Sequence, residues 1–147
     1  NRMIEYLNSN DPDVRMKATE VAYNKKRFQD LVDELFSYTK KTIDRTRNDV
    51  AFKQHGELLL PYQLSSAEKQ ILLILLTVLV QDFKPYVVFM DEPEASLHIE
   101  WQQRLISTVR ELNPNVQLIL TTHSPAVIME GWLDAVTEVS DISVLKE

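Results

Sequence analysis

The chain has 147 residues, which is enough for one domain with a sizeable hydrophobic core and too few for two large domains. Hydrophobic residues make up 44% and charged residues 26%, so the composition is globular and excludes a disordered chain. A net charge of −6 argues against a uniformly basic nucleic-acid binder, and the absence of cysteine excludes disulfides and thiolate metal sites. We therefore expect a cytoplasmic protein.

A long helix is predicted for the first third of the chain. Asp11 is a good N-cap residue, Pro12 suits the first helical position, and no glycine or proline follows as far as residue 48. Apolar and small residues recur there at spacings of four and three, as in a coiled-coil seam, and such a helix would reach roughly 50 Å. Both a projecting helical arm and an ordinary core helix are compatible with this pattern. The seam positions are Val14, Ala18, Val21, Lys25, Phe28, Val32, Leu35, Thr39 and Thr42.

Basic residues cluster on the same stretch, and clusters of this kind can contact the phosphates of a nucleic acid. Acidic residues are interleaved with them, which favours the alternative of an ordinary solvated helix face. The basic residues are Lys25, Lys26, Arg27, Lys40, Lys41, Arg45 and Arg47, and the acidic ones are Asp30, Asp33, Glu34 and Asp44.

The rest of the chain predicts an α/β fold. Residues 50–63 are expected to form a strand pair that turns at His55 and Gly56, and the tail over residues 135–145 is expected to be a strand. Between them, short apolar strands alternate with helices, as in a parallel sheet covered on both faces. The expected elements are a helix over 65–81, a strand over 86–90, a helix near 97–112, a strand over 117–121 and a short helix after Pro125. The longest apolar run, residues 71–80, is about half of a membrane span, so no membrane segment is expected.

Polar side chains follow two of the predicted strands directly. Asp91 and Glu92 come after the apolar residues 87–90, and His123 follows the strand over 117–121. Open α/β sheets bind ligands at the carboxyl ends of their strands. There one acid can hold Mg²⁺ beside nucleotide phosphates, its neighbour can activate a water, and the histidine can donate to a phosphate oxygen. Each also has a simpler explanation, because Asp-Glu-Pro is a common turn and a histidine can cap a helix.

A third motif lies at the start of the helix predicted from residue 65. Ser65 and Glu68 form an S-x-x-E capping box before an apolar run, which a plain helix start explains fully. The alternative uses the same geometry, because a serine and free backbone amides at a helix N-terminus bind anions.

The order of these motifs resembles the ABC ATPase superfamily, in which a signature, a Walker B strand, a D-loop and a switch histidine follow one another. Residues 64–70 resemble the LSxGEKQ signature of SMC-like ATPases. Residues 91–98, DEPEASLH, resemble the prokaryotic AAA-like group that includes the OLD-family enzymes and the Septu-type anti-phage ATPases, which are also found with retrons. The resemblance covers roughly residues 60–130. It implies a P-loop NTPase fold of the ABC ATPase head type with a parallel sheet. Residues 50–147 would form the C-terminal half of this head, and residues 1–49 would form a helical arm segment that precedes it.

The resemblance also implies roles for individual residues and a set of cofactors, ATP and Mg²⁺. Asp91 would position Mg²⁺, Glu92 would be the general base and His123 would sense the γ-phosphate. Such heads form dimers that sandwich two ATP molecules, so the active unit implied is a homodimer or a larger homo-oligomer. The residues implied to reach nucleotide across that interface are Ser65, Ser66, Ala67 and Glu68 of the signature, with Ser96 and His98 in the D-loop.

Two departures from the family pattern bear on function. Ala67 stands where the family usually has glycine, and its methyl could weaken a close approach to phosphate. The two glycines, Gly56 and Gly131, do not belong to a GxxxxGK[ST] sequence, so the Walker A half of the head is missing and we expect the chain to be part of a longer protein.

The function implied is an ATP-hydrolysing switch in anti-phage defence that controls a separate nuclease effector, with nucleic acid as a further partner. The alternatives are an OLD-type ATPase with its own nuclease, an SMC/RecF-like DNA-repair ATPase, and a scaffold that binds ATP without useful turnover. The departure at Ala67 favours the last of these.

Overall fold

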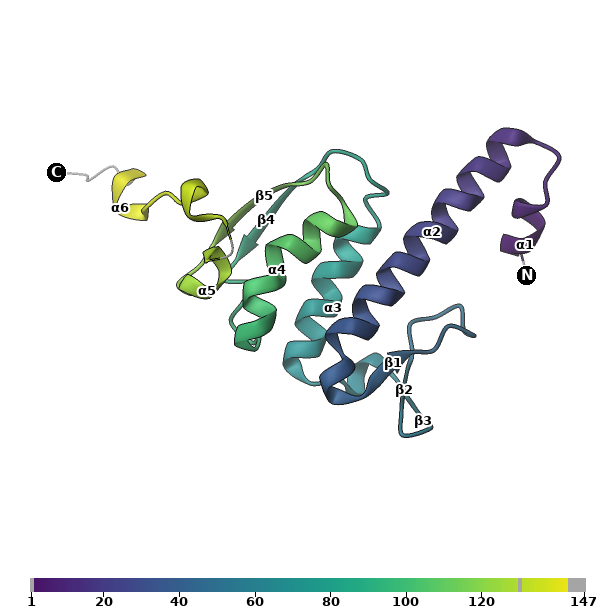
Figure 1. Ribbon diagram of the computed structural model, residues 1–147, viewed down its shortest axis with the longest axis horizontal. Helices are drawn as coiled ribbons and strands as arrows, with labels where there is room; N and C mark the ends of the chain where they lie inside the picture. The colour runs from purple at the N-terminus through teal and green to yellow at the C-terminus, as the bar shows by residue number, and fades with distance from the viewer. Residues whose placement is uncertain (1, 130, 143–147) are drawn as a thin grey trace.

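The computed structural model of the chain describes residues 2–129 and 131–142. Its helices are α1 (Arg2–Leu7), α2 (Pro12–Leu35), α3 (Ser66–Leu79), α4 (Ile99–Leu112), α5 (Pro125–Ile128) and α6 (Val139–Ile142), and short 3₁₀ helices cover Ser37–Thr39, Pro61–Gln63 and Leu133–Ala135. Its strands are β1 (Lys41–Ile43), β2 (Phe52–Gln54), β3 (Glu57–Leu59), β4 (Val87–Asp91) and β5 (Gln117–Thr121). Helices α2, α3 and α4 pack together, with the β4–β5 sheet beside α3 and α4 and the β1–β3 sheet at the end of α2 (Figure 1).

Helix α2 begins as predicted and ends earlier than predicted. The Asp11 carboxylate accepts a hydrogen bond from the Asp13 amide at 2.9 Å, and Pro12 occupies the first turn. The helix stops at Leu35, so its 24 residues span about 36 Å and not the expected 50 Å. Lys40, with φ 56°, adopts a left-handed conformation that turns the chain into a strand. Burial of Phe36 and Ile43 in the core outweighs the weak helix propensity of this stretch.

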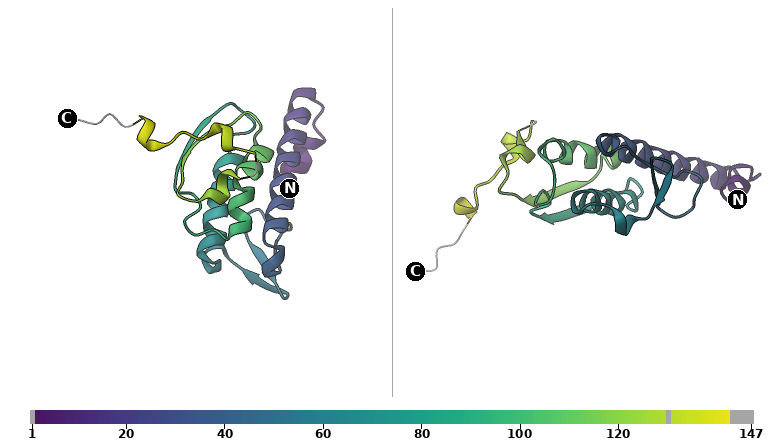
Figure 2. Two further views of the ribbon diagram at one scale, coloured as in Figure 1. Left: turned by 60° about the vertical axis from the view of Figure 1, so that its left-hand side comes forward. Right: turned by 90° about the horizontal axis from the view of Figure 1, so that it is seen from below.

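The two halves of α2 have different surroundings. The core-helix interpretation fits the second half, and the interpretation as a projecting helix fits the first. The second half is a core helix, because its apolar seam from Phe28 to Leu35 is buried. The first half extends beyond the rest of the domain with α1 packed along it, and Val14, Met16 and Val21 are exposed there (Figure 2). The first turns of α2 therefore extend beyond the packed helices, and the division into a helical arm over residues 1–49 stays a prediction, as does coiled-coil pairing.

An antiparallel meander connects α2 to α3. The predicted strand pair is confirmed, with Phe52 opposite Leu59 and a tight turn at His55 and Gly56, whose φ values are 51° and 85°. Strand β1, which pairs Lys41 with Gln54, lies in the stretch that was predicted to be helical. This pairing crosses the division predicted at residue 49, so the two segments share one sheet.

Strands β4 and β5 pair in parallel, as the α/β pattern predicts. Side chains on one face of the sheet, Val88, Met90 and Leu118, pack against the core formed with α3 and α4. Side chains on the other face are exposed, with Phe89 at 74%. The expectation of a sheet covered on both faces is therefore wrong within the described residues, where helices cover one face only.

A cluster of three aromatic rings joins the meander to the helices. Phe36, which follows α2, lies 5.5 Å from the Phe52 ring of β2 and 5.8 Å from the Trp101 ring of α4, measured between centroids. Phe36 and Phe52 are fully buried, and Trp101 is 8% exposed. Three segments far apart in the sequence thus share one core, which fixes the end of α2 against α4.

The predicted tail strand is wrong for its described part. Residues 133–135 form a 3₁₀ helix and residues 139–142 form α6, while positions 143–145 of the predicted strand lie outside the described residues. Val136 and Ile142 are exposed, and the described strands do not pair with this segment. A short apolar pattern without a neighbouring strand does not specify a strand. Within the described residues, every helix is too short or too polar to cross a bilayer.

Candidate functional site

The predicted residue Asp91 lies at the carboxyl end of β4, where it contacts the end of β5. Asp91 ends β4 directly opposite Thr121 at the end of β5. The Thr121 hydroxyl donates a hydrogen bond to Oδ1 of Asp91, so the carboxylate is held at the sheet edge while staying exposed to solvent. A carboxylate fixed at this edge has the position that open α/β sheets use for ligands.

Glu92 follows in a backbone conformation that is unusual for a residue with a side chain. Its φ is 42°, and its amide donates to the Thr121 carbonyl at 3.1 Å. A left-handed conformation costs a non-glycine residue about 1–2 kcal/mol, and such strain often occurs at functional sites. Here the turn directs the chain away from the strand immediately after Asp91, so that the two neighbouring acids have different environments.

His123 lies beside Glu92, as the strand order predicts. Its Nε2 is 3.3 Å from Oε1 of Glu92, and the two side chains are 91% and 51% exposed. An exposed pair of this kind contributes little to stability, since both groups are well hydrated. Its value is chemical: a carboxylate and an imidazole lie within contact distance beside the Asp91 carboxylate at one open edge.

Glu94 is a buried residue of this edge that the sequence reasoning did not assign to the site. It is 5% exposed, and its Oε1 accepts hydrogen bonds from the Thr122 hydroxyl and from the His123 amide, the latter at 3.2 Å. Its Oε2 is buried and has no hydrogen-bond partner among the described residues. Glu94 therefore ties the loop after β4 to the loop that carries His123. Its place in the DEPE sequence was the available signal.

Gln102 of α4 forms hydrogen bonds to both of these loops, which the sequence did not predict. Its Nε2 donates to the Leu97 carbonyl at 2.9 Å, and its Oε1 accepts from the Ser124 hydroxyl at 2.6 Å. The loop of residues 93–98 and the loop after β5 are thus both anchored to the first turns of α4. A glutamine on an amphipathic helix gives no sequence signal for such a role.

The two residues predicted for the D-loop lie on this anchored segment. Ser96 is exposed, and His98 is the N-cap position of α4, where its ring contacts Trp101 edge-on at 5.6 Å between centroids. Both side chains are accessible on the surface. Their predicted contact with a second copy stays a prediction.

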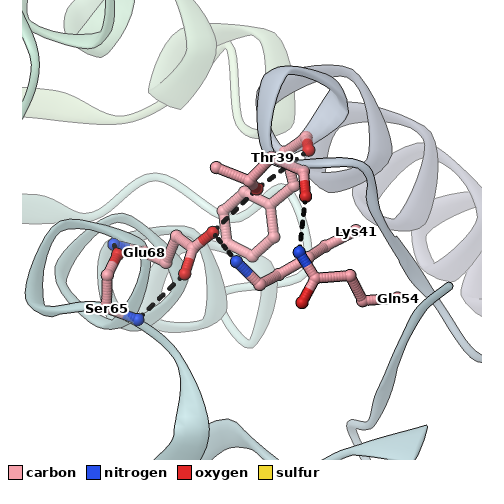
Figure 3. Close-up of polar contacts among 6 residues, drawn as sticks. Thr39, Lys41, Gln54, Ser65 and Glu68 are labelled. Atoms are coloured by element: carbon pink, nitrogen blue, oxygen red, sulfur yellow. Dashed lines mark hydrogen bonds and ion pairs between the residues drawn. The ribbon is translucent and has the colours of Figure 1, made fainter. Parts of the chain in front are cut away.

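The signature residues lie at the amino end of α3, where the capping box is confirmed (Figure 3). The Ser65 hydroxyl accepts from the Glu68 amide at 3.3 Å, and Oε2 of Glu68 accepts from the Ser65 amide at 2.9 Å. Ser65 and Ser66 are exposed, whereas Ala67 is 7% exposed and belongs to the hydrophobic core. The Ala67 methyl therefore points into the protein, away from the solvent at the helix end.

Glu68 is the most buried of the predicted site residues. It is 1% exposed, and its two oxygens accept hydrogen bonds from Ser65, Thr39 and Lys41. Burial acts to raise its pKa, but the Lys41 ammonium and the hydrogen bonds from Ser65 and Thr39 outweigh burial and hold that pKa below its ordinary value. This environment favours a positioning role for Glu68 over direct contact with a nucleotide, which stays a prediction.

The predicted residues therefore form two groups. Asp91, Glu92 and His123 meet at the sheet edge, and the residues from Ser65 to Glu68 form the start of α3. Within the described residues, no hydrogen bond or ion pair joins one group to the other. Two surface hollows, between α2 and α4 and between α1 and α2, are lined by neither group.

Ion pairs among the described residues involve five of the seven basic residues that cluster over residues 25–47, namely Lys26, Arg27, Lys41, Arg45 and Arg47. Arg45 bonds to Asp30 and Asp33 at 2.8 and 2.7 Å, and Arg47 bonds to Asp49 at 2.8 Å. Lys41 is paired with Glu68 in the interior. This pairing supports the interpretation of a solvated, internally neutralised surface, and nucleic-acid contact by these residues stays a prediction.

The arrangement of helices and strands shows the fold class of the protein. The fold is similar to that of an Smc head bound to the C-terminal winged-helix domain of ScpA, with a TM-score of 0.59 and 18% identity, covering 80% of this chain and 39% of that one. At this identity the likeness shows the fold alone, which is that of the P-loop NTPases. The α/β fold with a parallel sheet is thereby confirmed.

The family follows from the sequence comparison. Residues 14–130 match the family described as "AAA domain, putative AbiEii toxin, Type IV TA system", and the chain belongs to this family. It is 33% identical over 98 residues to "Retron Vc95 probable ATPase" of Vibrio cholerae and 30% identical over 119 residues to "Retron Ec83 probable ATPase" of Escherichia coli, covering 58% and 71% of this chain. It is 35% identical over 55 residues, 37% of the chain, to the Septu protein PtuA of Bacillus thuringiensis. The matched regions are 19%, 22% and 14% of those relatives' lengths.

Proposed function

We propose that the chain is the part of an ATP-hydrolysing enzyme that supplies the acids, the switch histidine and the signature of the nucleotide site. The observation that carries this proposal is the meeting of Asp91, Glu92 and His123 at the carboxyl edge of a parallel sheet. Membership of the AAA family supports it, as do the names of the retron relatives.

Asp91 fits the role of a Mg²⁺ ligand. Its Oδ1 is oriented by Thr121, and the side chain is exposed at the strand end. No cluster of three or more metal-binding side chains exists within the described residues. One carboxylate nevertheless suits Mg²⁺, which usually keeps several waters and binds nucleotide phosphates through its remaining positions. When bound, the ion would supply charge neutralisation at those phosphates.

Glu92 and His123 are assigned the two proton-dependent roles. The Glu92 carboxylate accepts the proton of the attacking water, and the neighbouring imidazole donates a hydrogen bond toward the terminal phosphate. The two groups already lie 3.3 Å apart without a nucleotide. Glu94 holds the His123 amide, so that the imidazole is presented from a loop of fixed backbone position.

The signature residues act on a nucleotide bound by a second copy of the protein. Ser65 and Ser66 are exposed at the amino end of a 14-residue helix, where backbone amides and a hydroxyl favour an anion. Within the described residues this helix end makes no hydrogen bond or ion pair with the acids of its own chain, which agrees with a site shared between two copies. The buried Ala67 methyl removes the main argument for a scaffold without turnover.

In the cell, we assign this ATPase to anti-phage defence, where nucleotide turnover controls a separate nuclease effector. The similarity to retron-associated and Septu proteins supports this assignment. Loss of phage protection on Glu92→Gln substitution, with normal protein levels, would agree with it. DNA-stimulated turnover together with intact protection would instead favour a DNA-repair ATPase.

The direct test is steady-state phosphate release by the protein at its full natural length. Glu92→Gln should lower kcat by roughly 10²–10⁴-fold, since a positioned general base contributes about that factor. Glu100→Gln is the matched control, because Glu100 is an exposed acid of α4 outside the site. Equal turnover in Glu92→Gln and wild type would refute the general-base assignment.

A further inference from the structure

The amino end of α3 is bonded to a segment that precedes it by more than twenty residues. The buried Glu68 side chain, which completes the capping box of Ser65, is also bonded to Thr39 and Lys41 at the junction between α2 and β1 (Figure 3). The helix cap requires only the contact between the Ser65 amide and the Glu68 carboxylate. The additional bonds join the signature segment to the end of α2.

The two carboxylate oxygens of Glu68 accept hydrogen bonds from different segments. Oε2 accepts from the Ser65 amide at 2.9 Å, while Oε1 accepts from the Thr39 hydroxyl and the Lys41 ammonium, both at 2.8 Å. One rigid carboxylate therefore bridges the signature backbone and the α2–β1 junction.

The bridge is buried, which makes it stronger and more directional than a surface ion pair. The side chains of Lys41 and Glu68 are 13% and 2% exposed. Removing one partner of a buried pair leaves the other charge uncompensated, a strongly unfavourable state. The two groups are therefore constrained to move together.

The junction is itself bonded to strand β2 and packed against helix α4. The Gln54 side chain donates to the Thr39 carbonyl at 2.8 Å, and Phe36, three residues before Thr39, is stacked against Trp101. Trp101 belongs to α4, whose first turns anchor the loops at the sheet edge through Gln102. A continuous set of packed and bonded groups thus runs from the end of α2 to both parts of the site.

We propose that the Lys41–Glu68 pair is a positioning latch that holds Ser65 and Ser66 in the geometry required to contact a nucleotide phosphate, and that couples this segment to the position of α2. This inference rests on the proposed function. Lys41 and Thr39 are thus positioning residues that act through Glu68, and α2 becomes the element through which a partner can change turnover.

The test compares Lys41→Met with Lys25→Met in the protein at its full natural length. Lys25 is an exposed lysine of α2 and provides the same change of side chain without an ion pair to Glu68. Amide hydrogen exchange over residues 64–70 should become roughly tenfold faster or more in Lys41→Met and stay unchanged in Lys25→Met. In Lys41→Met kcat should fall by about tenfold or more while KM for ATP stays within about threefold, because the latch acts on the trans contact and not on initial ATP binding.

Different results would contradict the latch and the proposed function. Unchanged exchange in Lys41→Met, or faster exchange with an unchanged kcat, would overturn the latch while leaving an active ATPase. Wild-type protein without ATPase activity would instead overturn the proposed function. If Lys41→Met does not fold, the double variant Lys41→Met with Glu68→Gln removes the uncompensated charge. Thr39→Val keeps the ion pair and removes only the hydrogen bonds of the Thr39 hydroxyl, to Glu68 and to the Phe36 carbonyl. Both should retain a lowered kcat with a near-normal KM, and a wild-type kcat in the double variant would refute the proposal.

Discussion

The hydrogen bonds of Glu94 allow a quantitative prediction about the loop that carries His123. In Glu94→Ala the Thr122 hydroxyl and the His123 amide lose their acceptor. Hydrogen bonds to charged groups contribute about 1.5–3 kcal/mol each, and both bonds end on the Glu94 carboxylate, so the two together represent about 3–6 kcal/mol. The same substitution removes the buried Oε2 atom that has no partner among the described residues, which offsets roughly 1 kcal/mol or more of the loss.

The net loss of about 2–5 kcal/mol should accelerate amide exchange of residues 121–124 by roughly 30- to 5,000-fold. Exchange measured by mass spectrometry on the whole protein gives this ratio directly. Glu94→Gln keeps one acceptor oxygen and should fall between wild type and Glu94→Ala. Glu100→Ala, at an exposed acid of α4, is the control. Wild-type exchange of the His123 amide in Glu94→Ala would refute the claim that Glu94 positions this loop.

Three further predictions concern the fold. Phe36→Ala should destabilise the protein by about 3–5 kcal/mol in urea unfolding, because it empties the space between Phe52 and Trp101, whereas Tyr38→Ala at a 92% exposed position should stay within about 0.5 kcal/mol. The Thr46 hydroxyl and amide, together with Lys53, lower the pKa of Asp44 to about 2. The contribution of Asp44 to stability is therefore complete above its ordinary pKa of 3.8 and is lost as the pH falls toward 2. Asp44→Asn should flatten the dependence of stability on pH in that window, and an unchanged dependence would contradict this. Asp11→Ala should cost about 0.5–2 kcal/mol and increase amide exchange in the first turn of α2, since it removes the side-chain cap; unchanged exchange there would exclude a capping role.

The sequence predicted best those features that depend on local chemistry. The capping box of Ser65, the turn at His55 and Gly56, and the parallel pairing of two apolar strands follow from short-range rules, and all three are present. The proximity of Glu92 and His123 followed from one further rule, that parallel strands end at the same edge.

Features that depend on distant contacts were not predictable from the pattern. The helix over residues 12–48 ends at Leu35 because Phe36 is buried against Phe52 and Trp101, and no local breaker marks that position. The bond between Lys41 and Glu68 joins residues that are 27 positions apart, and in the sequence Lys41 was one member of a basic cluster. Likewise the exposed face of the β4–β5 sheet carries the apolar residues Val87 and Phe89, so hydrophobicity alone did not distinguish its two faces.

The central claim is that Glu92 of one copy and the signature of another copy act on the same ATP. Glu92→Gln and Ser66→Arg variants test it, because Ser66 is exposed and takes no part in the capping bonds. Each variant alone should be nearly inactive. In an equimolar mixture that exchanges subunits, half of the dimers are mixed and each mixed dimer has one intact site, so turnover should recover to about a quarter of the wild-type value. A mixture that stays as inactive as its two components would contradict a site shared between two copies.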